Sequence, residues 1–372
     1  MLSRRAFLGL SSVIACTPTW AKLTPPKSDL NLFASAFSKT NGAGLKSHHF
    51  GLFDTQGKMV WQTQLAKRAH APLVHPSQAI VGIVARRPGF FIDFFDVTSQ
   101  QLVSRIEPET DHHFYGHALF TLDGQRLITQ ENHYPSGQGK IFIREWPSGK
   151  VLQHFPSNGI GPHESVLLKE DVLVVANGGL KTHPSEDRKI LNLESMAPNV
   201  SYVSLIDGKI LNQAANAPEL HQLSIRHLDV NAQGTVALGF QYQGPLWDRV
   251  PLVALSRLDQ TELEYLPIPE AIRQRFKQYC GSVCFDRSGD VLAISTPRGG
   301  FVAYWHVESK TFLGVDNCRD VCGLVAHNHS HEFILTTGNG KQFSTNPVQN
   351  RIQMINKQAD VHWDNHLREI SV

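Results

Sequence analysis

The sequence predicts an all-β protein, built as a β-propeller of seven blades. Two observations lead to this prediction. A unit of short apolar strands and glycine-rich turns recurs along the chain, and the two chain ends supply complementary parts of one more unit. Repeats of this length are typical of blades that pack around a central axis.

The repeated unit starts with a short apolar strand. Its starts lie near positions 70, 117, 163, 227, 282, 323 and 366, which are 47, 46, 64, 55, 41 and 43 residues apart. A propeller blade takes roughly 40–50 residues in four strands. A second apolar run follows each start and ends in a polar turn, as at Asn177-Gly-Gly and Arg298-Gly-Gly. The longest spacing contains residues 181–199, which we interpret as a loop insertion.

The two chain ends complete the count of blades. Residues 31–37, 49–54 and 59–65 predict the second, third and fourth strands of a blade, and the C-terminal residues 366–371 supply its first strand. Six internal blades and one shared blade make seven, as in WD40-like and YVTN-like propellers. Pairing of the termini removes the exposed sheet edges that promote aggregation. Helices are expected to be scarce, with a turn or two in residues 267–278.

The first 21 residues have the pattern of an export signal. Arg4 and Arg5 precede a short apolar run, as in twin-arginine signal peptides. Cleavage after Ala21 would leave residues 22–372 as a single propeller domain; the less favoured alternative is a lipoprotein-type site that acylates Cys16. Both alternatives predict a periplasmic protein. No later apolar run approaches the ~20 residues of a transmembrane helix.

The charge balance argues against nucleic-acid binding. The chain has 35 basic and 33 acidic residues, for a net charge of +2, whereas nucleic-acid sites need concentrated positive charge. Gly-x-Ser-x-Gly and His-Glu-x-x-His motifs are absent from the sequence, so the residues assign no enzymatic reaction. The unusual count is that of histidine, at 19.

Histidine occupies the same place in the first strand of five blades. The first strand of a blade is innermost, so we expect these side chains to converge on the axis at one mouth of the channel. The other two blades carry Ser282 and Gly323. The five residues are His70, His117, His163, His227 and His366.

Three interpretations of this histidine ring compete. The first is a metal ion, iron or copper, because neutral imidazole is a ligand of both. The second is structural, with each imidazole hydrogen-bonded to the neighbouring blade. The third is an anion site whose histidines gain charge as the pH falls. Convergence of five residues favours the metal. Supporting residues around it are expected to be Glu164, Arg226, Asn177, Glu131 and Arg298, since metal-bound histidines usually donate their other N–H to a carboxylate or carbonyl.

Four cysteines follow the predicted signal peptide. Cys280 and Cys284 flank one strand and lie too far apart for a mutual bridge. An oxidising periplasm favours a disulfide between adjacent blades, with Cys280 and Cys322 as the pair that fits best and Cys318 as the alternative partner for Cys280. The rival interpretation is that these thiolates join the metal ligands.

Several motifs of this sequence resemble those of a bacterial family of exported propellers that carry a domain of unknown function. The resemblance covers nearly the whole chain after the signal. Members are often encoded beside imelysin-type iron-uptake proteins, which implies such proteins as partners. The motifs include Phe114-Tyr-Gly-His117, Ile160-Gly-Pro-His163-Glu164, Ser224-Ile-Arg226-His227 and Ser295-Thr-Pro-Arg298-Gly-Gly.

Two hypotheses of function follow from the sequence. The first is a periplasmic metal-binding or redox protein that uses the five ring histidines. The second is a non-enzymatic scaffold for iron-uptake partners, in which the histidines are structural.

Overall fold

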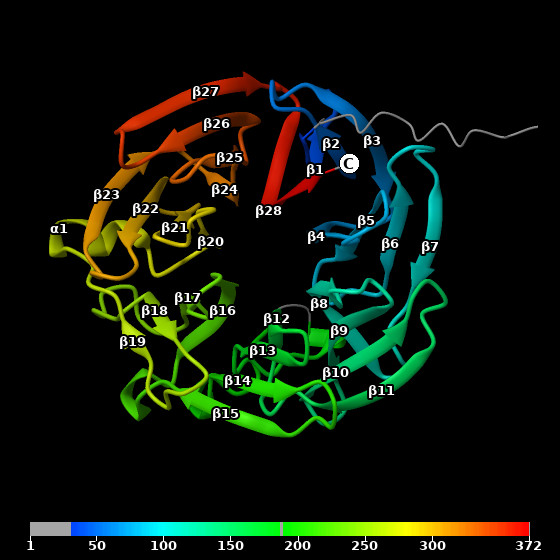
Figure 1. Ribbon diagram of the computed structural model, residues 1–372, viewed down its shortest axis with the longest axis vertical. Coiled ribbons are helices and arrows are strands. Elements are labelled where there is room, and N and C mark those ends of the chain that lie inside the picture. The colour runs from blue at the N-terminus through cyan, green and yellow to red at the C-terminus, as the bar shows by residue number, and fades with distance from the viewer. Residues whose placement is uncertain (1–30, 187–188, 372) are drawn as a thin grey trace, which may run out of the picture.

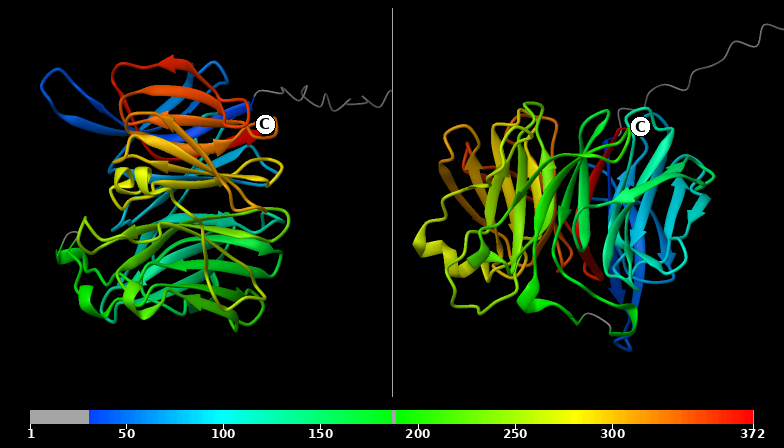
Figure 2. Two further views of the ribbon diagram at one scale, coloured as in Figure 1. Left: turned by 90° about the vertical axis from the view of Figure 1, so that its left-hand side faces the viewer. Right: turned by 90° about the horizontal axis from the view of Figure 1, so that it is seen from below.

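The protein is a propeller whose seven four-stranded antiparallel sheets stand around a central axis (Figure 1). The computed structural model describes residues 31–186 and 189–371. The predicted export signal, with Arg4, Arg5 and Cys16, lies outside the described residues. Figure 2 shows the ring of sheets from two sides. The predicted fold class and the number of blades are confirmed.

The blades are numbered along the chain, and each is given from its innermost strand outward. Blade 1 has β28 (Val361–Ser371), β1 (Asn31–Thr40), β2 (Lys46–Phe53) and β3 (Met59–Leu65); blade 2 has β4 (Ala69–Val74), β5 (Ile80–Ala85), β6 (Ile92–Asp96) and β7 (Leu102–Ile106); blade 3 has β8 (His112–Phe120), β9 (Arg126–His133), β10 (Gln138–Glu145) and β11 (Val151–Pro156). Blade 4 has β12 (Pro162–Lys169), β13 (Val172–Asn177), β14 (Asn199–Ser204) and β15 (Ile210–Ala215); blade 5 has β16 (Leu223–Val230), β17 (Val236–Tyr242), β18 (Val253–Ser256) and β19 (Glu264–Tyr265). Blade 6 has β20 (Ser282–Phe285), β21 (Val291–Thr296), β22 (Phe301–His306) and β23 (Phe312–Asn317); blade 7 has β24 (Val321–Ala326), β25 (Phe333–Thr337), β26 (Lys341–Asn346) and β27 (Arg351–Lys357).

The two ends of the described chain meet in blade 1, as predicted. β1 pairs with β28 from Asn31↔Ser371 to Lys39↔Val361. β28 begins at Val361, before the predicted start at residue 366, because its first residues pair with the extended end of β1. The Ser35 hydroxyl also donates to the His366 carbonyl at 2.8 Å, where the pairing shifts register. This pairing fixes His366 relative to the other blades.

Apolar side chains hold neighbouring blades together. One cluster joins Ile128 and Ile141 of blade 3 to Val175 and Val203 of blade 4, and all four side chains are fully buried. Strands in the middle of a blade are covered on both faces, so β5 and β13 are apolar almost throughout rather than alternating. Burial of each such side chain contributes roughly 1.5–3 kcal/mol. The strength of the ring therefore comes from contacts between blades.

Helices are few among the described residues. α1 (Glu270–Arg273) and the 3₁₀ helix η4 (Gln274–Phe276) fall within the predicted stretch. None of the described helices has the length and apolar character needed to cross a bilayer. The remaining 3₁₀ helices are η1 (Pro184–Glu186), η2 (Leu193–Ser195) and η3 (Pro218–Leu220), the first two within the long connection between β13 and β14.

The four cysteines of the described chain are buried free thiols, so the expected Cys280–Cys322 disulfide is not formed in this structure. Cys280 packs in the apolar core of blades 5 and 6, and its thiol donates to the Leu252 carbonyl at 3.3 Å. The Cys322 thiol donates to the Asp320 carbonyl within its own blade, at 3.2 Å. Burial raises the pKa of Cys280 to about 12. The two thiols thus form hydrogen bonds in different blades and not with each other.

We expect Trp363→Ala to weaken the closure of the ring. Trp363 is 3% exposed and packs against Phe37 and Phe53, with ring centroids 5.2 and 5.1 Å away. Removing a buried aromatic side chain costs roughly 3–5 kcal/mol, which urea unfolding would measure. Trp247→Ala is the matched control, because Trp247 is 80% exposed and its loss should change stability by less than about 0.5 kcal/mol. Equal stabilities of the two variants would contradict this account.

Candidate metal centre

The five predicted histidines meet on the propeller axis. Each lies on the innermost strand of its blade, and none is more than 9% exposed. Centroids of facing imidazole rings lie 4.5–6.3 Å apart. The convergence predicted from the spacing of the repeats is therefore present. The imidazoles are buried within the channel instead of standing open at its mouth.

The two blades without a ring histidine use small residues for packing. A side chain at Gly323 would place its Cβ 3.0 Å from Leu367 Cβ and 3.3 Å from the His366 carbonyl carbon. Ser282 donates to the Cys322 carbonyl at 3.2 Å and also to the Asn365 carbonyl. These blades approach β28 closely, and this leaves no room for further imidazoles.

A β-bulge accompanies each ring histidine. The register of the inner strand shifts across His70, His117, His163 and His366. In blade 5 it shifts between Ile225 and His227, directly before the histidine. A bulge adds a residue and re-aims the side chains beside it. It therefore turns the imidazoles of five differently spaced blades toward one centre.

Glu164 connects two of the ring histidines. Its Oε1 lies 3.2 Å from His117 Nδ1, and its Oε2 lies 3.1 Å from His227 Nδ1. An ionised carboxylate only accepts hydrogen bonds, so both Nδ1 atoms carry the proton and both Nε2 atoms keep a free lone pair. Burial alone would raise the pKa of Glu164, but His117 and His227 hold it well below its ordinary value. Glu164 thus contacts two ring histidines, and its support of a bound metal ion stays a prediction.

Asp364 supports the opposite side of the ring and was not predicted. Its Oδ1 lies 3.6 Å from His70 Nδ1, and it also forms ion pairs with Arg68 and Arg86. His70 Nε2 in turn lies 3.2 Å from His366 Nε2. Asp364 stands two residues from His366 on β28, and this period-two spacing was the signal in the sequence that could have identified it.

Burial keeps the imidazoles neutral. Desolvation lowers the pKa values of His70, His163, His227 and His366 below the ordinary 6.5. Neighbouring charge adds to this effect, from Arg226 on His163. Neutral imidazole is the form that binds metal ions.

The ring nitrogens form two overlapping groups with the composition of a metal site. His70, His117 and His366 make one group, and His117, His163 and His227 make the other; within each, the ligand atoms lie within 4.8 Å of one another. Metal–nitrogen bonds of ~2.1 Å set nitrogen–nitrogen distances of about 3.4 Å in a tetrahedral site, so small side-chain rotations suffice. His117 Nε2 is buried and has no hydrogen-bond partner within residues 31–186 and 189–371. An orphaned acceptor shared by both groups fits a metal ligand.

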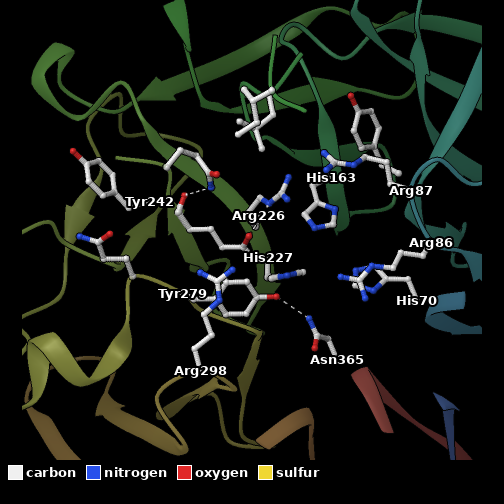
Figure 3. A pocket seen from close by; sticks show the side chains of 16 residues that line it. His70, Arg86, Arg87, His163, Arg226, His227, Tyr242, Tyr279, Arg298 and Asn365 are labelled. Carbon is white, nitrogen blue, oxygen red and sulfur yellow. Dashed lines mark hydrogen bonds between the residues drawn. The ribbon is translucent and has the colours of Figure 1, made fainter. Parts of the chain in front are cut away.

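Two cavities lie on either side of the ring. The larger, about 260 Å³, is lined by His70, His163 and His227 and by residues of turns that join second to third strands (Figure 3). The smaller, about 30 Å³, is lined by His117 and His366 together with Glu164. Arg226 and Arg298, two of the predicted supporting residues, line the larger cavity.

Two other predicted supporting residues serve their own blades. Asn177 bonds to Ser157, Asn199 and Ser201. Glu131 bonds to Arg144 at 2.7 Å and to Thr129 at 2.8 Å. Both lie on the second strand of a blade, and their side chains are hydrogen-bonded to other residues of the same blade. Neither therefore contacts a ring imidazole.

The comparison with protein families gives one match. The model of the family described as "Protein of unknown function (DUF1513)" matches residues 63–370. The chain belongs to the DUF1513 family. Its match includes all five ring histidines, Glu164 and Asp364. Among curated proteins, none matches the sequence.

His113 of this DUF1513 protein should make the fold sensitive to acid. It is buried between Phe90 and Tyr115, and its Nε2 accepts from Asn132 Nδ2 at 3.0 Å. Burial, helped by Arg87, His112 and His183, lowers its pKa to about 4. The unfolded chain therefore takes up this proton first, so the stabilisation is complete above pH 6.5 and is lost as the pH falls toward 4.

The loss should be about 3 kcal/mol for this group. His113→Gln removes the titration, so its unfolding free energy should fall less between pH 7.5 and pH 4.5 than that of the parent protein. His154→Gln is the control, because His154 is exposed on β11. An equal fall for the parent protein and His113→Gln would refute the assignment.

Proposed function

We propose that this protein binds one metal ion, iron or copper, in the histidine ring. The observation that carries the proposal is the pair of overlapping three-histidine groups that share His117. Imidazole-rich sites suit iron, copper, zinc and nickel, and the first two also support electron transfer. We propose that the protein acts in the periplasm, after export through its N-terminal signal.

The hydrogen bonds around the ring support a ligand set over a purely structural one. Glu164 accepts hydrogen bonds from the Nδ1–H groups of His117 and His227, so their Nε2 lone pairs point away from the carboxylate. A histidine that only joins two blades would have its second nitrogen bonded to protein as well. His117 Nε2 and His163 Nδ1 instead have no partner among the described residues. Carboxylate support of this kind is usual for metal-bound histidines.

The cavity above the ring gives the proposed ion access to a further ligand. His163 and His227, two ligands of one proposed group, line it, so an ion held by that group would border open space. Catalytic metal sites keep such an open position, whereas structural sites are closed. This arrangement supports binding or redox exchange of a small ligand at the ion.

His117→Ala should abolish stoichiometric metal binding, because it removes a ligand from both groups. We expect the affinity for iron(II) or copper(II) to fall by more than about 100-fold, since loss of a ligand's partner alone costs 10–100-fold. Reconstitution of metal-free protein, followed by elemental analysis, measures the bound metal. The double variant His163→Ala/His227→Ala, which leaves the other group complete, should retain weaker binding.

The control for these variants is His154→Ala, which removes an exposed histidine from the same propeller. Melting curves followed by circular dichroism check that every variant is folded. A parent protein that takes up none of iron, copper or zinc would overturn the proposal and leave the ring as a structural element of a scaffold.

Glu164→Gln should lower metal affinity by about 10–100-fold while it preserves the shape of the site. The amide can no longer accept from both Nδ1 atoms with a full negative charge, so one imidazole loses its orientation. Competition with a metal-sensitive dye measures the affinity. Glu131→Gln is the matched control, since it also alters a buried carboxylate but one that pairs with Arg144. If both variants bind metal alike, the role of Glu164 is wrong.

A further inference from the structure

The larger cavity has a second feature besides the histidines. Four arginines line it, and every other charged or titratable side chain that the described residues contribute to its wall is a histidine or a tyrosine. Figure 3 shows the four guanidinium groups on different sides of the space above His163 and His227. They are Arg86, Arg87, Arg226 and Arg298.

The arginines come from three blades. Arg86 and Arg87 follow β5 in blade 2, Arg226 lies on β16 in blade 5, and Arg298 lies in the turn after β21 in blade 6. Their common property is that the ring brings them to one cavity, which is the arrangement expected of a binding site for an anion with more than one charged group.

Three of the four guanidinium groups are held in position by neighbouring side chains. Arg298 stacks on the Tyr279 ring, with its Cζ 4.5 Å from the centroid. Arg226 is 8% exposed, and its Nε donates to Gln241 Oε1 at 3.4 Å. Asp364 lies 3.6 Å from Arg86. Groups that are already ordered lose little entropy when they bind a ligand.

The rest of the wall favours a small, polar ligand. Asn365, Gln278 and Gln241 offer amide groups, and Tyr279 offers a phenol that accepts from Asn365 Nδ2 at 3.1 Å. Leu180 and Ile190, both in the long connection between β13 and β14, supply an apolar side. The volume of about 260 Å³ lies below the ~300–1,000 Å³ typical of drug-sized ligands.

We propose that this cavity binds a small organic di- or tricarboxylate. Arginine pairs with carboxylate through two parallel hydrogen bonds, and arginines from opposite blades would hold carboxylates at opposite ends of one molecule. The ring histidines form the floor of the cavity, so a further carboxylate would reach the ion there. This last contact rests on the proposed function, whereas the arginine contacts do not.

Isothermal titration of the full chain with tricarballylate and with succinate tests the proposal. These acids lack the hydroxyl group that makes many polycarboxylates strong chelators, so they report the cavity and leave the ion in place. We expect both to bind, with tricarballylate the tighter, and binding to weaken as salt is added. Succinamide, the neutral analogue, should not bind.

Arg298→Gln should lower the affinity for tricarballylate by about 10–100-fold, because one charge-assisted hydrogen-bonded pair is lost. Arg275→Gln is the matched control: Arg275 also stacks on an aromatic ring, that of Phe301 at 4.7 Å, but does not line the cavity. Its affinity for tricarballylate should stay within about two-fold of that of the parent protein. Arg275 lies outside both proposed sites, so Arg275→Gln should also keep the parent's metal content.

The outcomes separate the two proposals. If the parent protein holds metal but binds neither acid, the carboxylate site is wrong and the metal centre stands. The same conclusion follows if the Arg298→Gln variant binds both acids as tightly as the parent protein does. A protein that takes up no metal but binds tricarballylate through Arg298 supports the carboxylate site and overturns the metal centre. Tighter binding of tricarballylate after metal loading supports the contact between acid and ion.

Discussion

The pairing of β1 with β28 is the constraint on which the rest of this propeller depends. It joins residues that are more than 300 positions apart and closes the ring. Closure sets the distance of each inner strand from the axis, and it carries His366 and Asp364 into the channel on the same strand. Because sheets in a propeller pack mainly against their neighbours, a loss of this one pairing would loosen every blade contact and separate the imidazoles.

The number of blades and the histidine ring could be predicted from the sequence because both depend on repetition. Equivalent positions of a repeat occupy equivalent places in space, so five histidines at one position had to converge. Features without a repeated residue type were missed. Asp364 belongs to one blade alone, and the bulges recur beside all five histidines but no residue type marks them in the sequence. Asn177 and Glu131 were assigned to the ring only because their turns lie near it. The cysteine pairing depended on the direction of side chains within cores, which spacing does not reveal.

Burial has opposite effects on the two kinds of ionisable group in the ring. It lowers the pKa values of His70, His163, His227 and His366 and so favours their neutral form. For Glu164 it acts against the charged form, yet the hydrogen bonds from His117 and His227 prevail. The ring thus has two buried carboxylates beside its imidazoles, Glu164 next to His117 and His227 and Asp364 next to His70. Arginines lie close to both carboxylates, Arg368 to Glu164 and Arg86 to Asp364, and offset part of the cost of burying them.

Because the ring histidines close the channel, they determine how a metal ion and a carboxylate ligand would enter and leave the site. Five imidazoles fill the axis. The smaller cavity, on one side of them, has room for about one water molecule. Any larger ligand would therefore reach the ring through the larger cavity. The larger cavity is lined by guanidinium groups, which repel a bare cation and attract an anion. A metal ion bound by several carboxylates forms a complex of net negative charge, which the guanidinium groups would attract and not repel. The same electrostatics would make the departure of the organic anion the step that precedes release of the ion.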